Sequence, residues 1–394
     1  MERTYNIFVD NGLFVLANYL DKDIEDITEL DIINSVEYFS DRFIKMYNTE
    51  KYRTTAFSSF QNSAYTQKPT KESVKNQFEK LIENINKESI GSCTICGNNS
   101  VPKYEDSLIS SLTKSLFPRL CSNTFFNFSN NLKQINICPT CFYLSMLSFF
   151  NIKSLLNQCI LFESDDNEYM YDYTYEHKLE VDNDILINAT KYKKNSKEVK
   201  SVKGEMSNLL IDKINKNKIY DGYIDIVKFY NSSQGESFER NLISNKDLKM
   251  LKELQSKSLL SEFRELNLMY KMLNGSLQKN YLNCVFDFKQ NKIITSKDLT
   301  NIIEERYNKL RGEKLEVIKR IAKKINKKDI NIVKNLKGID KLGQFEKILT
   351  SLIETIPNLM TMDEFDSLCN YKEFASVKNR LYVELINLKN EGEM

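Results

Sequence analysis

The chain is poor in residues on which many enzymes depend. Its 394 residues include one histidine, five prolines, eleven glycines and no tryptophan. The single histidine, His177, excludes a His-based catalytic triad, a His-ligated metal nuclease centre and an HD-type site. The sequence also lacks a Gly-rich phosphate loop, a dinucleotide-binding fingerprint and a Gly-x-Ser-x-Gly motif. We therefore expect a protein that is not an enzyme.

The chain has neither a strong excess of charge nor a long apolar run. Its 56 basic and 54 acidic residues leave a net charge of +2, so a nucleic-acid surface would require local segregation of charge. The most apolar stretch, 142–162, carries amide and lysine side chains that are costly in lipid. It predicts buried helices rather than a membrane span. The amphipathic start predicts no signal peptide.

Two C-x-x-C pairs dominate the middle of the sequence: Cys93, Cys96, Cys138 and Cys141. A two-residue gap lets both thiolates of a pair bind one ion, and two pairs complete a tetrahedral site. We predict a structural zinc ion within residues 88–145 that closes a long loop. Four reduced thiols, or one redox pair, are the alternatives. Four sulfur ligands would leave zinc no position for an activated water.

Four further cysteines, Cys121, Cys159, Cys284 and Cys369, follow no pattern. Free thiols together with a four-cysteine metal site indicate a reducing compartment, and we expect a cytoplasmic protein.

Hydrophobic patterning predicts an α+β N-terminal region. Residues 5–10 form a short apolar segment, Asn11 and Gly12 predict a turn, and Thr28 with Asp31 predicts a helix start. Tyrosine, valine and isoleucine content then favours strands. We place these strands at 169–175, 179–181, 185–187 and 220–230, with His177 on the surface beside them.

The segment Ser232–Gly235 predicts a domain boundary, dividing the chain into 1–235 and 236–394. Beyond Phe238 the pattern is helical, with one helix over 259–273 and others over 299–310 and 374–388. The predicted fold class is therefore α+β, with a zinc-clamped mixed N-terminal region followed by an all-helical C-terminal bundle.

Three segments are candidates for nucleic-acid contact. Amides can bind base edges, which makes Gln61 and Asn62 candidates, and lysines can bind phosphates. A basic loop over 189–203 supplies Lys191, Lys193, Lys194 and Lys197. A predicted amphipathic helix supplies Lys319, Arg320, Lys323, Lys324, Lys327 and Lys328. Solvated polar and basic surfaces are the alternative interpretation of all three segments.

The order of these motifs resembles the CRISPR-associated CXXC–CXXC proteins, the large subunits of type I-B Cascade complexes. The resemblance rests on the opening segment 7–13, on Phe60-Gln61-Asn62-Ser63, and on the two cysteine pairs. A helical C-terminal third is also similar. The first match implies that a strand, a turn and a helix open the chain.

This resemblance implies a non-catalytic subunit that binds the 5′ end of the guide RNA and recognises the protospacer-adjacent motif on target duplex DNA. Its partners would be the other Cascade subunits and the helicase-nuclease, and its C-terminal bundle would resemble the small subunit. Such a protein recognises a short motif and backbone shape while RNA pairing supplies sequence specificity. The alternatives are a metal-dependent nuclease that uses acids such as Asp165 and Asp166, or a zinc-stabilised scaffold that contacts only proteins.

Overall fold

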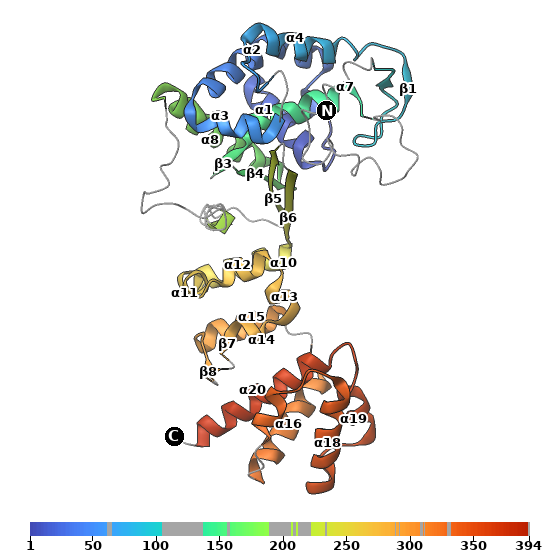
Figure 1. Ribbon diagram of the computed structural model, residues 1–394, viewed down its shortest axis with the longest axis vertical. Helices are drawn as coiled ribbons and strands as arrows, with labels where there is room; N and C mark the ends of the chain where they lie inside the picture. The colour runs from blue at the N-terminus through green and yellow to red at the C-terminus, as the bar shows by residue number, and fades with distance from the viewer. Residues whose placement is uncertain are drawn as a thin grey trace. The chain divides into compact units, whose positions relative to one another are not determined.

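The protein divides into two compact units, Met1–Asn245 and Lys246–Met394, each described here by itself. The computed structural model (Figure 1) describes residues 1–60, 65–104, 137–155, 158–188, 206–207, 210–211, 222–232, 235–287, 289–290, 292–307, 310, 312–328 and 332–392. The division falls ten residues beyond the predicted boundary, because the segment Ser232–Gly235 joins two paired strands of the first unit.

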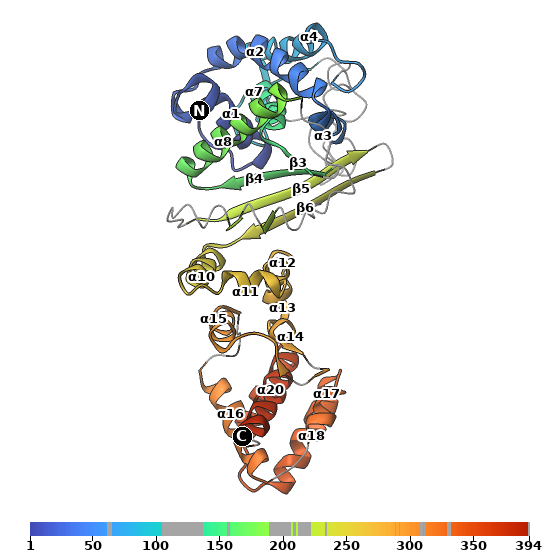
Figure 2. The same ribbon diagram turned by 90° about the vertical axis from the view of Figure 1, so that its left-hand side faces the viewer.

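The first unit combines helices with a four-stranded antiparallel sheet. Its elements are α1 (Ile7–Leu20), η1 (Ile24–Asp26), α2 (Glu29–Asn48), α3 (Glu50–Phe60), α4 (Lys71–Ile82), β1 (Ser89–Gly91), β2 (Val101–Pro102), α7 (Pro139–Leu147), η2 (Ser148–Asn151), β3 (Lys153–Leu155), β4 (Gln158–Ser164), α8 (Asn167–Leu186), β5 (Ile224–Ser232) and β6 (Gly235–Ile243). The sheet has the order β3-β4-β5-β6 (Figure 2), and α1, α3 and α8 pack against β4.

The prediction of a turn at Asn11 and Gly12 is wrong, because α1 runs through both residues. The side chain of Asn6 accepts hydrogen bonds from the backbone N–H groups of Phe8 and Val9 and so starts the helix earlier. Within the helix, Asn11 Nδ2 donates to the carbonyl oxygen of Phe162 at 3.1 Å. These residues therefore attach α1 to its neighbours, and no strand precedes the helix in the described residues 1–6.

Gly12 allows α1 and α7 to approach each other closely. A Cβ atom at this position would lie 1.6 Å from the carbonyl oxygen of Leu144 and 2.5 Å from its carbonyl carbon. Both obstructing atoms belong to the backbone of α7, so a rotamer change cannot relieve the overlap. The glycine is consequently a packing residue rather than a turn residue.

The predicted strands at 169–175, 179–181 and 185–187 are also wrong, because the single helix α8 covers all three segments. Asp166 caps the helix by accepting a hydrogen bond from the Tyr169 N–H at 3.1 Å. Tyr173, His177 and Val181 continue the buried face at four-residue spacing. The strand predicted at 220–230 corresponds in its second half to β5.

His177 is buried in α8 rather than exposed on a strand. Only 3 % of its surface is exposed, and its ring stacks on that of Tyr173 with a centroid separation of 6.4 Å. Nδ1 lies 3.6 Å from a carboxylate oxygen of Glu180. Burial lowers the pKa of His177.

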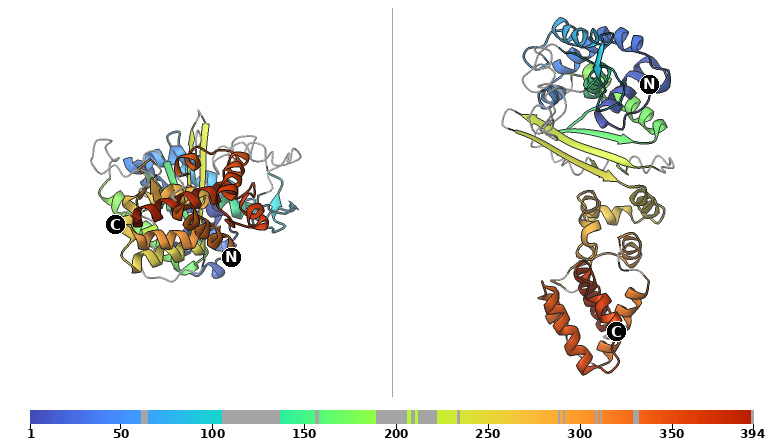
Figure 3. Two further views of the ribbon diagram at one scale, coloured as in Figure 1. Left: turned by 90° about the horizontal axis from the view of Figure 1, so that it is seen from below. Right: turned by 90° about the vertical axis from the view of Figure 1, so that its right-hand side faces the viewer.

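In its described residues the second unit is mainly helical and contains one pair of two-residue strands. Its elements are α10 (Asn245–Ser256), α11 (Leu260–Glu265), α12 (Leu268–Leu273), α13 (Ser276–Asn280), α14 (Leu282–Val285), β7 (Phe286–Asp287), β8 (Lys292–Ile293), α15 (Lys297–Tyr307), α16 (Glu313–Lys327), α17 (Val333–Lys337), α18 (Leu342–Thr355), α19 (Met362–Leu368) and α20 (Phe374–Gly392). The α20 helix lies between α16 and α18 (Figures 2 and 3).

Two predictions for this unit need correction. The pattern over 259–273 forms two short helices, α11 and α12, because Asn267 adopts a left-handed conformation with φ of 58° between them. Helix does not begin directly after Phe238 either, since β6 extends to Ile243. None of the helices in the described part of the chain is both long enough and apolar enough to cross a membrane.

Candidate metal centre and basic helix

The four cysteines of the two C-x-x-C pairs meet in one cluster. Their sulfur atoms all lie within 4.8 Å of one another, and Cys96 Sγ is 3.8 Å from Cys138 Sγ. Four thiolates placed in this way could hold a metal ion. The prediction that the two pairs converge is thus confirmed, while the identity of a bound ion belongs to the proposal below.

The first pair lies on a tight loop shaped by its own backbone. The Cys93 N–H donates to the Asn98 carbonyl at 2.8 Å, and the Gly97 N–H donates to the Cys93 carbonyl at 2.9 Å. Gly97 adopts a φ of 77°, a left-handed conformation that favours glycine. The Ile95 N–H also points at Cys93 Sγ, 3.4 Å away, so a backbone dipole stabilises negative charge on this sulfur.

The second pair lies at the N-terminus of α7. Cys138 is the N-cap and its sulfur accepts a hydrogen bond from the Cys141 N–H at 3.4 Å, while Pro139 occupies the first turn. The Cys138 N–H in turn donates to Cys93 Sγ at 3.3 Å and so connects the two pairs. The positive end of the helix dipole favours thiolate at Cys138 and Cys141, but hydrogen bonds among the clustered sulfurs and burial still raise the pKa of both thiols.

Repulsion between neighbouring thiolates would be relieved by a cation bound in this cluster. Hydrogen bonds from the Cys138 and Cys141 thiols hold the pKa of Cys93 far below its usual range. The pKa of Cys141 is raised well above its usual range by its hydrogen bonds with Cys138 and Cys93 and by burial. Without a cation, the charge on one sulfur therefore opposes the ionisation of its neighbours, and a divalent ion would remove this conflict.

The amphipathic pattern over residues 313–327 is confirmed as the helix α16, whose two faces differ. Ile318, Ile321 and Ile325 are buried and the helix packs against α20. Three of the six predicted basic residues have local partners. Lys319 pairs with Glu316 at 3.2 Å, Arg320 pairs with Glu364 at 2.6 Å, and Lys324 donates to the Asn358 carbonyl.

The remaining basic residues, Lys323, Lys327 and Lys328, are exposed and make no ion pair within the described ranges. Of the predicted contacts on this segment, these three are the most available for an external anion. The other candidates, Gln61, Asn62, Lys191, Lys193, Lys194 and Lys197, lie outside the described residues.

A buried ionic cluster that the sequence patterns did not predict lies at the start of the chain. Arg3 contacts Asp10 at 3.2 Å and Glu163 at 3.0 Å, and the two carboxylate side chains are 0 % and 1 % exposed. Asp10 also accepts hydrogen bonds from the N–H groups of Thr4 and Tyr5. An aspartate inside the apolar run 7–17 was the available signal, because such a residue needs buried partners.

This cluster predicts a pH-dependent stability. Burial and the nearby Asp10 carboxylate raise the pKa of Glu163 from 4.5 to about 8, although Arg3 opposes the rise. The Glu163 carboxyl ionises at a lower pH in the unfolded chain than in the folded protein. Its contribution to the free energy of unfolding is therefore present below pH 4.5 and is lost as the pH rises toward 8. Across this interval we expect the free energy of unfolding of the wild-type protein to fall by a few kcal/mol because of this carboxyl. The Glu163→Gln variant should not show this fall.

Urea denaturation from pH 5.5 to 8.5 tests this expectation. The curve for Glu163→Gln should be flatter than the wild-type curve, whereas the exposed control Glu88→Gln should follow the wild type. Parallel curves for wild type and Glu163→Gln would show that this carboxyl does not titrate in the folded protein over that range.

The carboxylates of the alternative nuclease site have structural partners. Asp165 Oδ1 accepts a hydrogen bond from the Tyr223 N–H at 2.9 Å, and Asp166 caps α8. Both residues therefore help to connect β4, α8 and β5. These contacts do not favour the nuclease interpretation.

The site class is a four-cysteine cluster of the kind that holds a structural metal, accompanied in the second unit by a basic helix. In comparisons with known proteins, no family model, curated protein or solved structure matches the chain.

Proposed function

We propose that this protein is a non-catalytic, zinc-binding large subunit of a type I CRISPR Cascade complex. The proposal rests on the resemblance of its cysteine pairs and their order to the CXXC–CXXC family, and on the convergence of the four sulfurs. In this role it would bind the 5′ end of the guide RNA, recognise the protospacer-adjacent motif on DNA and recruit the helicase-nuclease. Zinc is the ion that tetrahedral four-thiolate sites most commonly hold.

The exposed lysines of α16 and its C-cap residue Lys328 are the observation that carries the nucleic-acid part of this proposal. The buried face of the helix fixes its position against α20, so Lys323, Lys327 and Lys328 project from a rigid support. Lysines on a fixed surface can neutralise phosphates and release counterions, which gives affinity without sequence preference. Such contacts suit a subunit that holds nucleic-acid backbone while a guide RNA supplies specificity.

Charge reversal on α16 tests this function. We expect the change of Lys319, Lys323, Lys327 and Lys328 to glutamate to weaken binding to a labelled DNA duplex. If each lysine contacts one phosphate, the negative slope of log binding constant against log salt concentration should become shallower by about 3 to 4. Fluorescence anisotropy between 50 and 200 mM salt would measure both the affinity and the slope.

The control reverses four lysines at a different helix of the same unit. Lys246, Lys249, Lys252 and Lys257 lie on or next to α10 and give the same change in net charge. Reversing these four charges should leave the slope of log binding constant against log salt concentration close to the wild-type value. Equal losses for both variants would indicate an effect of net charge alone and would remove α16 from the proposal.

Composition of the native complex tests the assignment to Cascade. Purification of the tagged protein from its own cells should recover guide RNA and further Cascade subunits, identified by RNA sequencing and mass spectrometry. Recovery of proteins without RNA would support the scaffold alternative. Metal-dependent cleavage of DNA by the pure protein, lost in Asp165→Ala, would support the nuclease alternative.

A further inference from the structure

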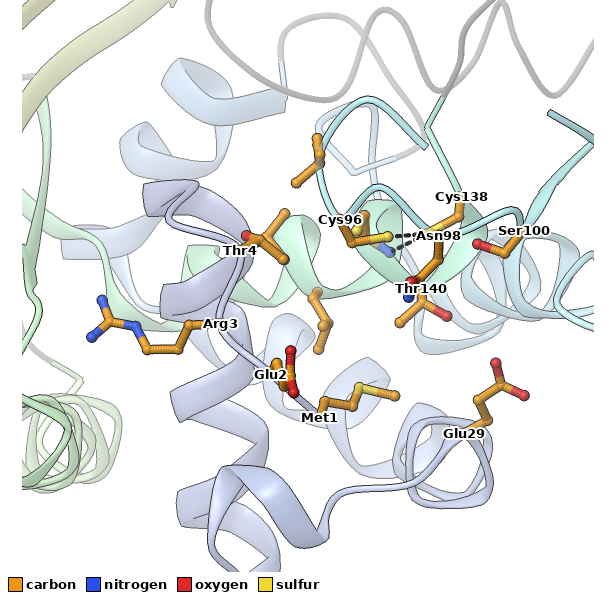
Figure 4. Close-up of a pocket in the computed structure, with 14 residues that line it drawn as sticks. Met1, Glu2, Arg3, Thr4, Glu29, Cys96, Asn98, Ser100, Cys138 and Thr140 are labelled. Carbon is orange, nitrogen blue, oxygen red and sulfur yellow. Dashed lines mark hydrogen bonds between the residues drawn. The ribbon is translucent and has the colours of Figure 1, made fainter. Parts of the chain in front are cut away.

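A cavity of about 590 Å³ lies directly beside the cysteine cluster. Cys96, Cys138 and Cys141 contribute to its wall, together with the polar side chains of Ser100 and Thr140. Figure 4 shows Cys96 and Cys138 directed toward each other at this wall. A small polar molecule inside the cavity could therefore reach the sulfur atoms from one side.

Cys96 is the accessible member of the cluster. Cys93, Cys138 and Cys141 are each only 2 % exposed, whereas Cys96 is partly exposed. Oxidation of cysteine follows exposure and thiolate character, and a cysteine that binds a metal is a thiolate. The first sulfur that an oxidant meets in this cluster is thus Cys96 Sγ.

Cys138 is placed to complete the reaction. Its sulfur lies 3.8 Å from Cys96 Sγ, so a modest movement of either side chain brings the pair to the 2.05 Å length of a disulfide. We propose that Cys96 and Cys138 form a peroxide-reactive pair whose oxidation releases the metal ion. This inference rests on the proposed metal site and adds a modification that the proposed function does not require.

The reaction balances with hydrogen peroxide as the oxidant. The Cys96 thiolate attacks one peroxide oxygen, the O–O bond breaks, and a sulfenic acid and a hydroxide ion form. The Cys138 thiolate then attacks the Cys96 sulfur, forms the S–S bond and expels a second hydroxide ion. Two sulfurs together lose two electrons, which reduce the peroxide, and the ion loses two of its four ligands.

The location of this disulfide determines what oxidation does to the fold. A bond inside either C-x-x-C pair would leave the loop between the pairs free to open once the metal has left. A bond between Cys96 and Cys138 joins residues 42 positions apart and replaces the metal as the closure of that loop. The proposed modification consequently removes the ion while the loop stays closed.

Peroxide treatment of the full-length protein tests the proposal. The zinc content is measured first, hydrogen peroxide is added, and released zinc is followed with a chromogenic chelator. Remaining thiols are then alkylated and peptides are mapped by mass spectrometry without reduction. We expect one zinc ion released for each Cys96–Cys138 cross-link, and full rebinding after reduction. Disulfides within the pairs, or oxidation without a disulfide, would overturn the proposal.

Two variants test whether peroxide enters through the cavity and whether a cysteine outside the cluster takes part in the reaction. Ser100→Phe should narrow the cavity and slow zinc release severalfold without changing the zinc content, and an unchanged rate would refute access through the cavity. Cys369→Ser changes a partly exposed cysteine outside the cluster and should leave the rate unaltered. A slower rate in Cys369→Ser would instead show that the reaction passes through that thiol.

The same experiment separates this inference from the metal proposal. Protein that contains no zinc before oxidation would count against the metal site, and the disulfide map would still show whether Cys96 and Cys138 pair. Protein that contains zinc but forms another disulfide would count against the pair alone.

Discussion

Replacing Cys138 by alanine is expected to abolish stoichiometric zinc binding and to lower the free energy of unfolding of the first unit by several kcal/mol. Binding free energy at a structural zinc site is folding free energy, and it amounts to roughly 10–16 kcal/mol in isolated zinc-finger peptides. The effect here should be smaller, because the unit also has a helical core and a four-stranded sheet. The loop between the cysteine pairs would lose its closure.

A serine variant separates the loss of metal from the loss of a helix cap. Cys138 caps α7 through the Cys141 N–H. Serine is a good N-cap residue, so Cys138→Ser should keep this hydrogen bond while it removes a thiolate ligand. Similar destabilisation in both variants would assign the effect to the metal. Cys369→Ala, outside the cluster, serves as the control for cysteine loss.

Zinc content by atomic emission and urea denaturation with and without a chelator measure these effects. Chelation should lower the stability of the wild-type protein toward that of Cys138→Ala and should leave the variant unchanged. The prediction would be contradicted if wild-type protein purified under reducing conditions contained no bound metal and if added zinc did not raise its stability in urea.

Gly12→Ala is expected to destabilise the first unit by about 3 kcal/mol or more. The added Cβ would lie 1.6 Å from the Leu144 carbonyl oxygen, so α1 and α7 would have to separate by more than an ångström. Overpacking in a core costs about 1–3 kcal/mol, and backbone obstruction places this site at the upper end. The same separation would disturb α7, which carries Cys138 and Cys141 at its first turn.

The matched control is the same substitution in a helix with open space. Gly343 lies in the first turn of α18, and a Cβ there would meet only a Glu346 side-chain oxygen at 3.9 Å. Since alanine favours helix over glycine by up to about 1 kcal/mol, Gly343→Ala should be neutral or stabilising. The denaturation midpoint should therefore fall for Gly12→Ala and should stay unchanged or rise for Gly343→Ala, and a Gly12→Ala protein as stable as wild type would refute close packing at this position.

Several features of the fold followed from local chemistry alone. The capping box of Thr28 and Asp31 was predicted and is present at the start of α2. The α16 helix has the predicted buried face, because an amphipathic period of 3.6 residues fixes which side chains can face a core. The convergence of the cysteine pairs was predictable because two C-x-x-C pairs can together bind one ion.

The α8 helix shows where local preference was a poor guide. Its tyrosine, valine and isoleucine content favoured strands, but strand preference depends strongly on packing context. The buried residues at four-residue spacing, Tyr169, Tyr173, His177 and Val181, were the better signal. His177 was assigned to a surface for the same reason, since its burial follows from the helical period.

The sequence by itself determined the two C-x-x-C pairs, the capping box of Thr28 and Asp31, and the amphipathic face of α16, because each of these depends on residues a few positions apart in the chain. Tertiary structure alone decided that Gly12 serves helix packing, that Arg3 joins Asp10 to Glu163, and that Cys96 faces a cavity beside Cys138. These features depend on contacts between residues up to 160 positions apart. Such contacts form only when the chain folds, and local spacing does not encode them.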